Sequence, residues 1–178
     1  MKNTSLRRVL RLTLPLLLLA LCLTLNGCFV FVPAPPPVDT SDLGAPQTFS
    51  KAGITLHLTD KFKEEQSERG FDAYYTTDYC GVVVLKEPFT LEAGLAERPI
   101  EQYIKNVIEN NGHENIEPRN ADGLWYYVNY NNSSYRCVYS YAYKGTDAFY
   151  VVQYIINTVD EETLKPVIHE WAKATSVG

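Results

Sequence analysis

The first part of the chain alternates apolar and polar residues with the period of β-strands. Ile54, Leu56 and Leu58 are separated by polar side chains, which is typical of a strand with one buried face. Residues 71–77 are aromatic and β-prone, and the apolar run within 82–86 indicates a strand covered on both faces. A turn between these two segments predicts a hairpin that follows the first strand.

The next segment has the spacing of an amphipathic helix. It begins after Pro99, which is tolerated at a helix start because its missing N–H would have no partner there. Asn110, Asn111 and Gly112 are expected to end the helix. Its apolar stripe, at i, i+3, i+4, i+7 and i+8, consists of Ile100, Tyr103, Ile104, Val107 and Ile108.

Three further strands are predicted at residues 124–130, 135–143 and 148–156, which are rich in tyrosine and β-branched residues. The turns at 131–134 and 144–147 are short, so these strands should form an antiparallel meander.

A second helical stripe lies near the end of the chain and consists of Leu164, Val167, Ile168, Trp171 and Ala172. Acidic residues at 160–162 precede it, where negative charge favours a helix start. Pro166 falls within the pattern, and a proline inside a helix clashes with the preceding turn. We therefore expect the regular helix to begin near Lys165 after a capping turn, in preference to a kinked helix.

Each helical stripe needs an apolar surface to cover. The order of elements therefore predicts an α+β domain in which an antiparallel sheet of about six strands is sandwiched between two helices.

This order, together with the opening FSKAGITLHLTDKF at residues 49–62, resembles the PsbP-like fold. The fold is shared by an extrinsic subunit of the photosynthetic oxygen-evolving complex, a nuclear transport cofactor and many uncharacterised bacterial lipoproteins. The resemblance covers residues 48–177 and implies an accessory binding subunit. No functional residue of the family can be matched to a position of this chain.

Residues 1–27 are typical of an export signal, with four basic residues before an apolar run at 14–25. A retained transmembrane helix is the alternative, but it would need about 20 apolar residues, and this run contains Pro15. The end of the segment resembles the lipobox of bacterial lipoproteins, with the residues Leu25, Asn26, Gly27 and Cys28. The resemblance implies cleavage before Cys28 and a diacylglyceryl group on its thiol.

Residues 28–47 are predicted to form the lipid anchor and a proline-rich tether, and residues 48–178 a single domain. The composition of 33–47 favours extended polyproline II and cannot bury a core. Two acyl chains hold a protein stably at a membrane. We therefore expect a domain tethered to a bacterial cell membrane on its extracytoplasmic side.

Charge limits the partners of this domain. Without the leader, 12 basic and 21 acidic residues remain, a net charge of −9. A surface with this negative charge repels nucleic acid and anionic lipid headgroups. The diacylglyceryl group on Cys28 must therefore hold the protein to the membrane.

Two cysteines remain once Cys22 is removed and Cys28 is lipidated. Cys80 and Cys137 are a candidate disulfide, because extracytoplasmic compartments are commonly oxidising. Two buried free thiols are the alternative, since the sequence does not show whether the Cα atoms lie within bridging distance.

Nine of the 13 tyrosines lie between Tyr126 and Tyr154. Alternation along the middle strand of the meander puts four of them on one face with Cys137, and hairpin pairing adds neighbours such as Tyr130. Tyrosine suits recognition of a peptide, a glycan or a protein, because it offers a large contact area at low entropic cost. Either a helix covers this face, or part of it stays open for a partner. The predicted binding surface consists of Tyr126, Tyr135, Tyr139, Tyr141, Tyr143 and Tyr150.

No phosphate loop, nucleophile elbow or convergent carboxylate motif is present in the sequence. His57, His113 and His169 lack the paired spacing of a zinc site, so no catalytic residue, metal or cofactor is predicted. The prediction is a non-catalytic, membrane-anchored module that binds a protein or an envelope component. The alternative is a small-ligand receptor or a small enzyme, which a concave pocket with convergent polar groups and shifted pKa values would indicate.

Overall fold

The computed structural model describes residues 36–66, 70–113 and 115–178. The predicted signal peptide and the lipidation site at Cys28 lie outside these residues. No helix in the described part of the chain is long and apolar enough to cross a membrane.

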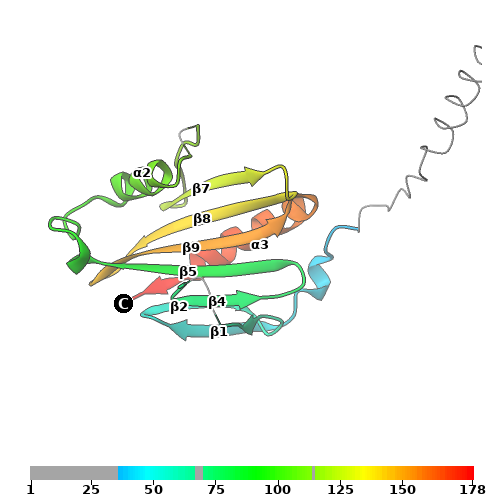
Figure 1. Ribbon diagram of the computed structural model, residues 1–178. Coiled ribbons are helices and arrows are strands. Elements are labelled where there is room, and N and C mark those ends of the chain that lie inside the picture. Colours follow the sequence, from blue (N-terminus) through cyan, green and yellow to red (C-terminus); the bar gives the residue numbers. More distant parts are fainter. Residues whose placement is uncertain (1–35, 67–69, 114) are drawn as a thin grey trace, which may run out of the picture. The chain divides into compact units, whose positions relative to one another are not determined.

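A seven-stranded sheet of order β3-β4-β5-β9-β8-β7-β6 forms the centre of the domain (Figure 1). All its neighbouring strands are antiparallel, so the predicted hairpin and meander are confirmed and join side by side through β5 and β9. In chain order the strands are β3 (Lys63–Glu64), β4 (Ala73–Thr76), β5 (Cys80–Pro88), β6 (Arg119–Ala121), β7 (Leu124–Asn131), β8 (Arg136–Lys144) and β9 (Ala148–Asn157).

A second sheet of three strands, in the order β1-β2-β10, was not predicted. It consists of β1 (Pro46–Lys51), β2 (Ile54–Thr59) and β10 (Ser176–Val177), of which the apolar pattern indicated β2 alone. β1 carries one apolar side chain between polar ones, and β10 has only two residues, so neither shows a readable period. Ala52 and Gly53 connect β1 to β2 with φ values of 56° and 90°, as in the two-residue turns that suit hairpins.

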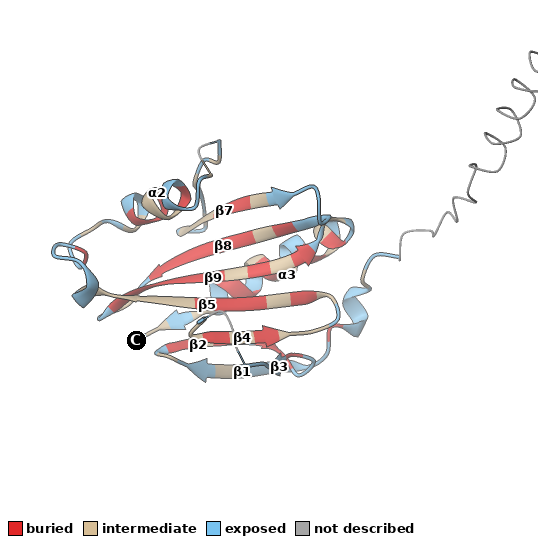
Figure 2. Cartoon of the chain, viewed as in Figure 1, coloured by how far each residue is buried: buried red, intermediate tan, exposed pale blue. Residues whose placement is uncertain are grey.

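Consecutive residues of the central strands point to opposite faces of the large sheet and enter two different cores. One face packs against α3 (Glu161–Ala174) together with the small sheet, and the other packs against α2 (Ile100–Asn110). Figure 2 shows the buried residues running along the central strands. The predicted α+β sandwich of a sheet between two helices is therefore confirmed, with the small sheet sharing one face with α3.

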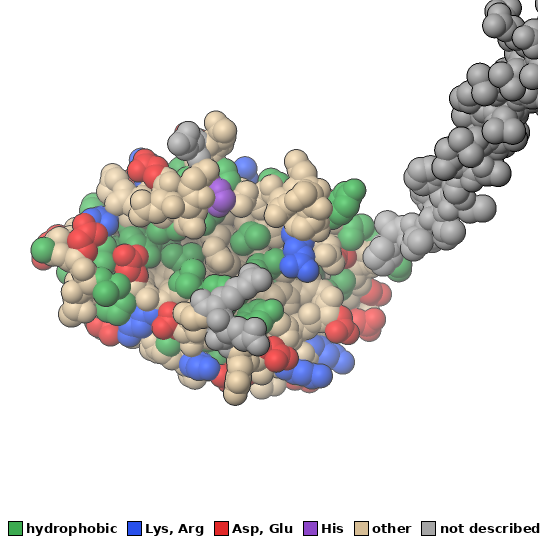
Figure 3. Space-filling view, viewed as in Figure 1, with side chains coloured by type: hydrophobic (Ala, Val, Ile, Leu, Met, Phe, Trp, Pro, Cys, Tyr) green, Lys and Arg blue, Asp and Glu red, His purple; other side chains and the backbone are tan. Residues whose placement is uncertain are grey.

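α2 begins after Pro99 and buries the predicted stripe through Tyr103, Ile104 and Ile108. The ring of Tyr103 stacks on Phe149 of β9 with centroids 3.9 Å apart and planes within 7° of parallel. The helix covers only part of its face of the sheet. Hydrophobic side chains therefore also reach the surface beside it (Figure 3).

α3 begins earlier than the sequence predicted. The helix starts at Glu161 and contains Pro166 in its second turn, so the predicted start near Lys165 is wrong. Pro166 removes one hydrogen bond, to the carbonyl of Glu162, and both residues are exposed. Water can satisfy that carbonyl, so the stripe of Leu164 and Ile168 remains in one continuous helix.

The two cysteines do not form the predicted disulfide. Cys80 on β5 and Cys137 on β8 are free and buried, and each is paired in register with Ile156 of β9. Strand β9 lies between them, so their Cα atoms are about 10 Å apart, beyond the roughly 7 Å that a disulfide can span. Burial raises the pKa of the Cys137 thiol to about 12 and also raises the pKa of Cys80. Both thiols are therefore structural and unreactive in the folded state.

The end of the predicted tether packs onto the domain. The N–H of Val38 donates to the buried carboxylate of Asp160 at 2.9 Å, and Val38 also packs against the core. After the short turn η1 (Thr40–Asp42), Leu43 is buried, and its carbonyl accepts a hydrogen bond from the hydroxyl of Tyr79 at 3.2 Å. The remaining single turns are η2 (Phe89–Leu91) and η3 (Thr158–Asp160). The chain is thus held to the domain from Val38 onwards.

The cysteine geometry predicts a specific labelling pattern. Cys80 and Cys137 should resist iodoacetamide in the native protein and react fully in urea without any reductant, as read by mass spectrometry of their peptides. In a Cys80→Ala control, the Cys137 peptide should behave in the same way. Labelling that required a reductant would show that the thiols are bonded and that the register is wrong.

Candidate functional site

Most of the predicted tyrosine surface is buried. Tyr139, Tyr141, Tyr143 and Tyr150 lie beneath α3 and the small sheet with at most 7% of their surface exposed, so the prediction that they form an exposed binding surface is wrong. Their shared face was predicted correctly, because the register pairs tyrosine with tyrosine on neighbouring strands. The alternative in which a helix covers this face therefore holds for these four residues.

The other two predicted residues reach solvent. Tyr135 is 76% exposed, but it lies in the β7–β8 turn with a φ of 52°, away from the sheet face. Tyr126 on β7 is half-buried, and its ring stacks on Tyr141 with centroids 5.0 Å apart and planes within 19° of parallel. The open part of the tyrosine face therefore centres on Tyr126.

Beside Tyr126 the sheet is hollowed into a groove of about 400 Å³. One side of α3 forms a wall, the tyrosines of β7 and β8 form the floor, and β6 contributes the other border. We call this the tyrosine groove. Its lining consists of Ala121, Tyr126, Tyr139, Tyr141, Glu162, Lys165, Pro166 and His169.

Hydrogen bonds join the sheet to α3 at both ends of the groove. At one end, Glu161 accepts hydrogen bonds from the hydroxyls of Tyr130 and Tyr139, each at 2.6 Å. At the other end, Asp122 lies 3.3 Å from Nε2 of His169 and 3.4 Å from the amine of Lys173. Asp122 belongs to the two-residue β6–β7 turn, so this turn is held against the helix.

His169 also lies within 3.4 Å of the Tyr141 hydroxyl through Nδ1. The arrangement of tyrosine, histidine and aspartate places a base beside a hydroxyl, as in nucleophilic catalysis. Burial, however, raises the pKa of Tyr141 well above its usual value. The hydroxyl is therefore protonated at neutral pH and serves there as a hydrogen-bonding partner of the imidazole.

Two side chains of the groove keep their charges unpaired. Lys165 and Glu162 are exposed, and neither makes an ion pair or a hydrogen bond with another described residue. The hydroxyl of Tyr126 likewise makes no hydrogen bond among the described residues. The groove thus combines an aromatic floor with polar groups that a ligand could engage. Its residues come from β6, β7, β8 and α3, which are far apart in the chain, so the sequence alone did not bring them together.

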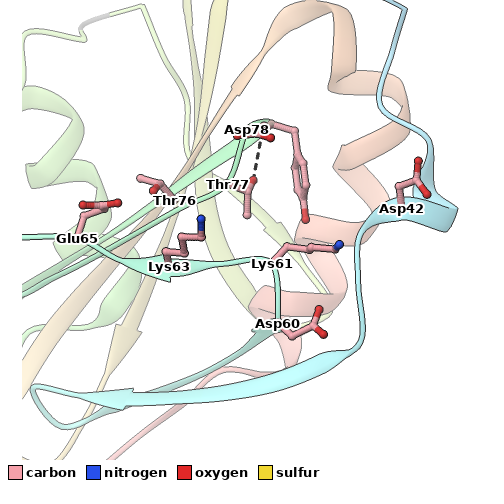
Figure 4. A pocket seen from close by; sticks show the side chains of 9 residues that line it. Asp42, Asp60, Lys61, Lys63, Glu65, Thr76, Thr77 and Asp78 are labelled. Atoms are coloured by element: carbon pink, nitrogen blue, oxygen red, sulfur yellow. Dashed lines mark hydrogen bonds between the residues drawn. The ribbon is translucent and has the colours of Figure 1, made fainter.

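A second hollow, of about 580 Å³, lies beside η1 where the chain enters the domain. Figure 4 shows Lys61 and Lys63 among carboxylates that include Asp42 and Asp60. Asp60 is already engaged, because it accepts a hydrogen bond from the N–H of Ala45 at 2.9 Å. Its side chains of opposite charge are interspersed and mostly exposed, and its lining contains one aromatic residue, Tyr79, whereas that of the tyrosine groove contains three tyrosines.

The three histidines lie in different parts of the domain. His57 is on β2 near Thr48, His113 follows α2 and contacts Asn129, and His169 lines the groove. In the part of the chain that the structure describes, no three His, Cys, Asp or Glu side chains are grouped so that they could hold a metal ion.

The bond between Tyr139 and Glu161 predicts a measurable loss of stability. Tyr139→Phe should lower the free energy of unfolding by about 1 to 2 kcal/mol, because a buried hydrogen bond to a charged group is lost. Tyr126→Phe is the matched control, since its hydroxyl has no partner, and should change stability by less than about 0.5 kcal/mol. Urea unfolding measures both, and equal effects would contradict the assigned bonds.

Alkaline pH should weaken the fold. The hydrogen bond to Glu161 and burial raise the pKa of Tyr130 to about 12, and burial also raises the pKa of Tyr139. The unfolded chain releases these protons near pH 10, so the stabilisation is complete below pH 10 and is lost as the pH rises towards 12. The free energy of unfolding in urea should therefore fall above pH 10, and less steeply in Tyr130→Phe. A constant value would contradict the shift.

No protein-family model matches the sequence, and no curated protein matches it either. Among solved structures, the chain is similar to the solution structure of cyanobacterial PsbP (CyanoP) from Synechocystis sp. PCC 6803. The TM-score is 0.50 at 14% sequence identity, and the alignment covers 79% of this chain and 97% of that one. At this identity the similarity concerns the fold, and the predicted PsbP-like fold is therefore confirmed.

Proposed function

We propose that this protein is a lipid-anchored, extracytoplasmic binding module that holds a protein or an envelope component in the tyrosine groove. The lipobox resemblance at Leu25 to Cys28 supports the anchor, and the resemblance to PsbP-like proteins supports an accessory role. The observation that carries the binding role is the groove itself. A half-buried aromatic floor with the unpaired charge of Lys165 beside it is the composition of a recognition site.

The docked end of the tether bears on how such a module would be presented. With Cys28 in the membrane and Val38 fixed to the domain, residues 29–37 remain as the spacer. At about 3.1 Å per residue, these residues would reach roughly 28 Å when extended. The domain would therefore work close to the membrane surface, within reach of envelope components or membrane-bound partners.

A small-ligand receptor is the second candidate, and the closed ends of the groove favour it. Bridges at Glu161 and Asp122 limit the length of any occupant, whereas a broad protein partner would favour an open face. A small enzyme is the other form of this alternative, in which His169 would be the base beside the Tyr141 hydroxyl.

A cross-linking pull-down of the lipidated protein from its own cells tests the proposal. Tyr126→Ala should lose the specific partner, because the open aromatic surface of the groove is removed, while Cys28→Ala should move the protein from the membrane fraction to the soluble fraction. Tyr135→Ala is the control, since Tyr135 is exposed but lies outside the groove.

The results separate the two parts of the proposal. A partner retained by Tyr126→Ala, with folding unchanged in a urea titration, would show that the groove is not the binding site. Membrane association that persisted in Cys28→Ala, in chains that mass spectrometry shows to lack residues 1–27, would show that the lipid is not the anchor.

A further inference from the structure

Large hydrophobic side chains of the described residues are exposed mainly at one end of the domain. Tyr130, Tyr135 and Val159 are 47%, 76% and 40% exposed, and they lie where β7 and β9 end and where β8 and α3 begin. The fourth such side chain, Leu91, follows β5 at the opposite end of the sheet, because β5 is antiparallel to β9. Exposed apolar side chains that gather in one place indicate a contact surface.

The chain enters the domain at this same end. The N–H of Val38 donates to Asp160 at 2.9 Å, and Asp160 directly follows Val159. Figure 1 shows η1, in blue, at the end of the sheet where α3 begins. We call the end with the three exposed side chains the tether end. With Cys28 in the membrane, the spacer of residues 29–37 brings the tether end to the bilayer before any other part of the domain.

Tyr135 is held in a backbone conformation that is unfavourable for its side chain. Its φ of 52° lies in the left-handed region, which glycine and asparagine adopt more readily than a bulky residue. The N–H and the hydroxyl of Thr158 fix this conformation by donating to the carbonyl of Tyr135 at 2.9 and 3.3 Å. The ring gains little from burial, because 76% of the residue is exposed. Strain without a packing benefit points to a role for the ring outside the fold.

The chemistry of the tether end favours a lipid interface. Tyrosine is enriched at membrane–water interfaces, because its ring enters the apolar layer while its hydroxyl stays in water. Residues 123–146 contain two basic residues and no acid, although residues 28–178 carry a net charge of −9. The carboxylates of Asp160 and Glu161 are occupied by hydrogen bonds within the protein. Exposed Asp42 and Asp78 would repel anionic headgroups, so a zwitterionic interface fits this end best.

From these features we infer that the tether end rests in the interfacial layer of a zwitterionic lipid membrane, with the ring of Tyr135 inserted among the headgroups. α3 begins at this end, so its first residue, Glu161, lies nearer the membrane than His169. This inference rests on the proposed lipid anchor and adds which part of the module faces the bilayer. The lipid still holds the protein without Tyr135, so Tyr135→Ala remains a control for the groove.

Tryptophan quenching in the full-length lipidated protein tests the inference, with the protein reconstituted in phosphatidylcholine vesicles whose acyl chains are partly brominated. In Tyr135→Trp, the added fluorescence should fall by about half, because the ring lies at the boundary of headgroups and acyl chains. Leu91→Trp is the matched control, since Leu91 is 69% exposed at the opposite end, and should lose little fluorescence. The wild-type signal of Trp125 and Trp171 is subtracted from both.

A stability measurement tests the assigned strain. Tyr135→Asn should unfold at a urea concentration equal to or above that of the wild type, because asparagine tolerates the left-handed backbone. A lower midpoint would show that the ring packs within the fold, and would overturn the inference.

Vesicle flotation separates this inference from the proposed function. If the protein floats with the vesicles while both tryptophan variants are quenched equally or not at all, the membrane contact is refuted and the anchor stands, with the tether end left for a protein partner. Quenching of Tyr135→Trp that required added phosphatidylglycerol would also overturn the inference, because an anionic lipid would then be recognised. Protein that did not float would contradict the anchor and the contact together.

Discussion

Four tyrosine hydroxyls of the large sheet, those of Tyr130, Tyr139, Tyr141 and Tyr143, pair with groups on α3 and fix how the helix lies on the sheet. Each aromatic ring buries about 150 to 250 Å², which at about 25 cal/mol per Å² contributes roughly 4 to 6 kcal/mol. A buried hydroxyl without a hydrogen-bond partner would lower the free energy of unfolding by about 1 to 3 kcal/mol. α3 supplies partners along its length, from Glu161 at its start to the carbonyl of Ala172 near its end, which accepts from Tyr143 at 2.8 Å. The register of the helix on the sheet is therefore fixed by polar bonds as well as by packing.

The same pairing creates the tyrosine groove. α3 and the small sheet together cover the centre of the face, and the strip left over lies on the side of β6 and β7. Because Glu161 and Asp122 tie the helix to the sheet at both ends of that strip, the opening has a fixed length. A stabilising network and the proposed recognition site thus share their residues, so variants that probe binding need conservative controls for stability.

Burial also sets the protonation state of the hydroxyls in the groove. A tyrosine, a histidine and an aspartate in a row are the components of a catalytic relay, but desolvation holds the proton on the hydroxyl of Tyr141. Near neutral pH such a group is a hydrogen-bonding partner of His169. The similarity to cyanobacterial PsbP provides a scaffold without assigning chemistry, so the geometry of the groove carries the functional argument.

The sequence by itself determined the α+β class, the order of the main strands, both helical stripes and the shared face of the tyrosines, because these follow from the period of apolar side chains along a local segment. It missed β1 and β10, which carry no period, and the start of α3, because the cost of Pro166 depends on the exposure of Glu162. Only the tertiary structure decided that β9 separates Cys80 from Cys137, that four tyrosines are buried, and that Tyr126, Lys165 and His169 meet at one groove. Distances between residues far apart in the chain depend on strand order and helix placement, and no local pattern encodes these.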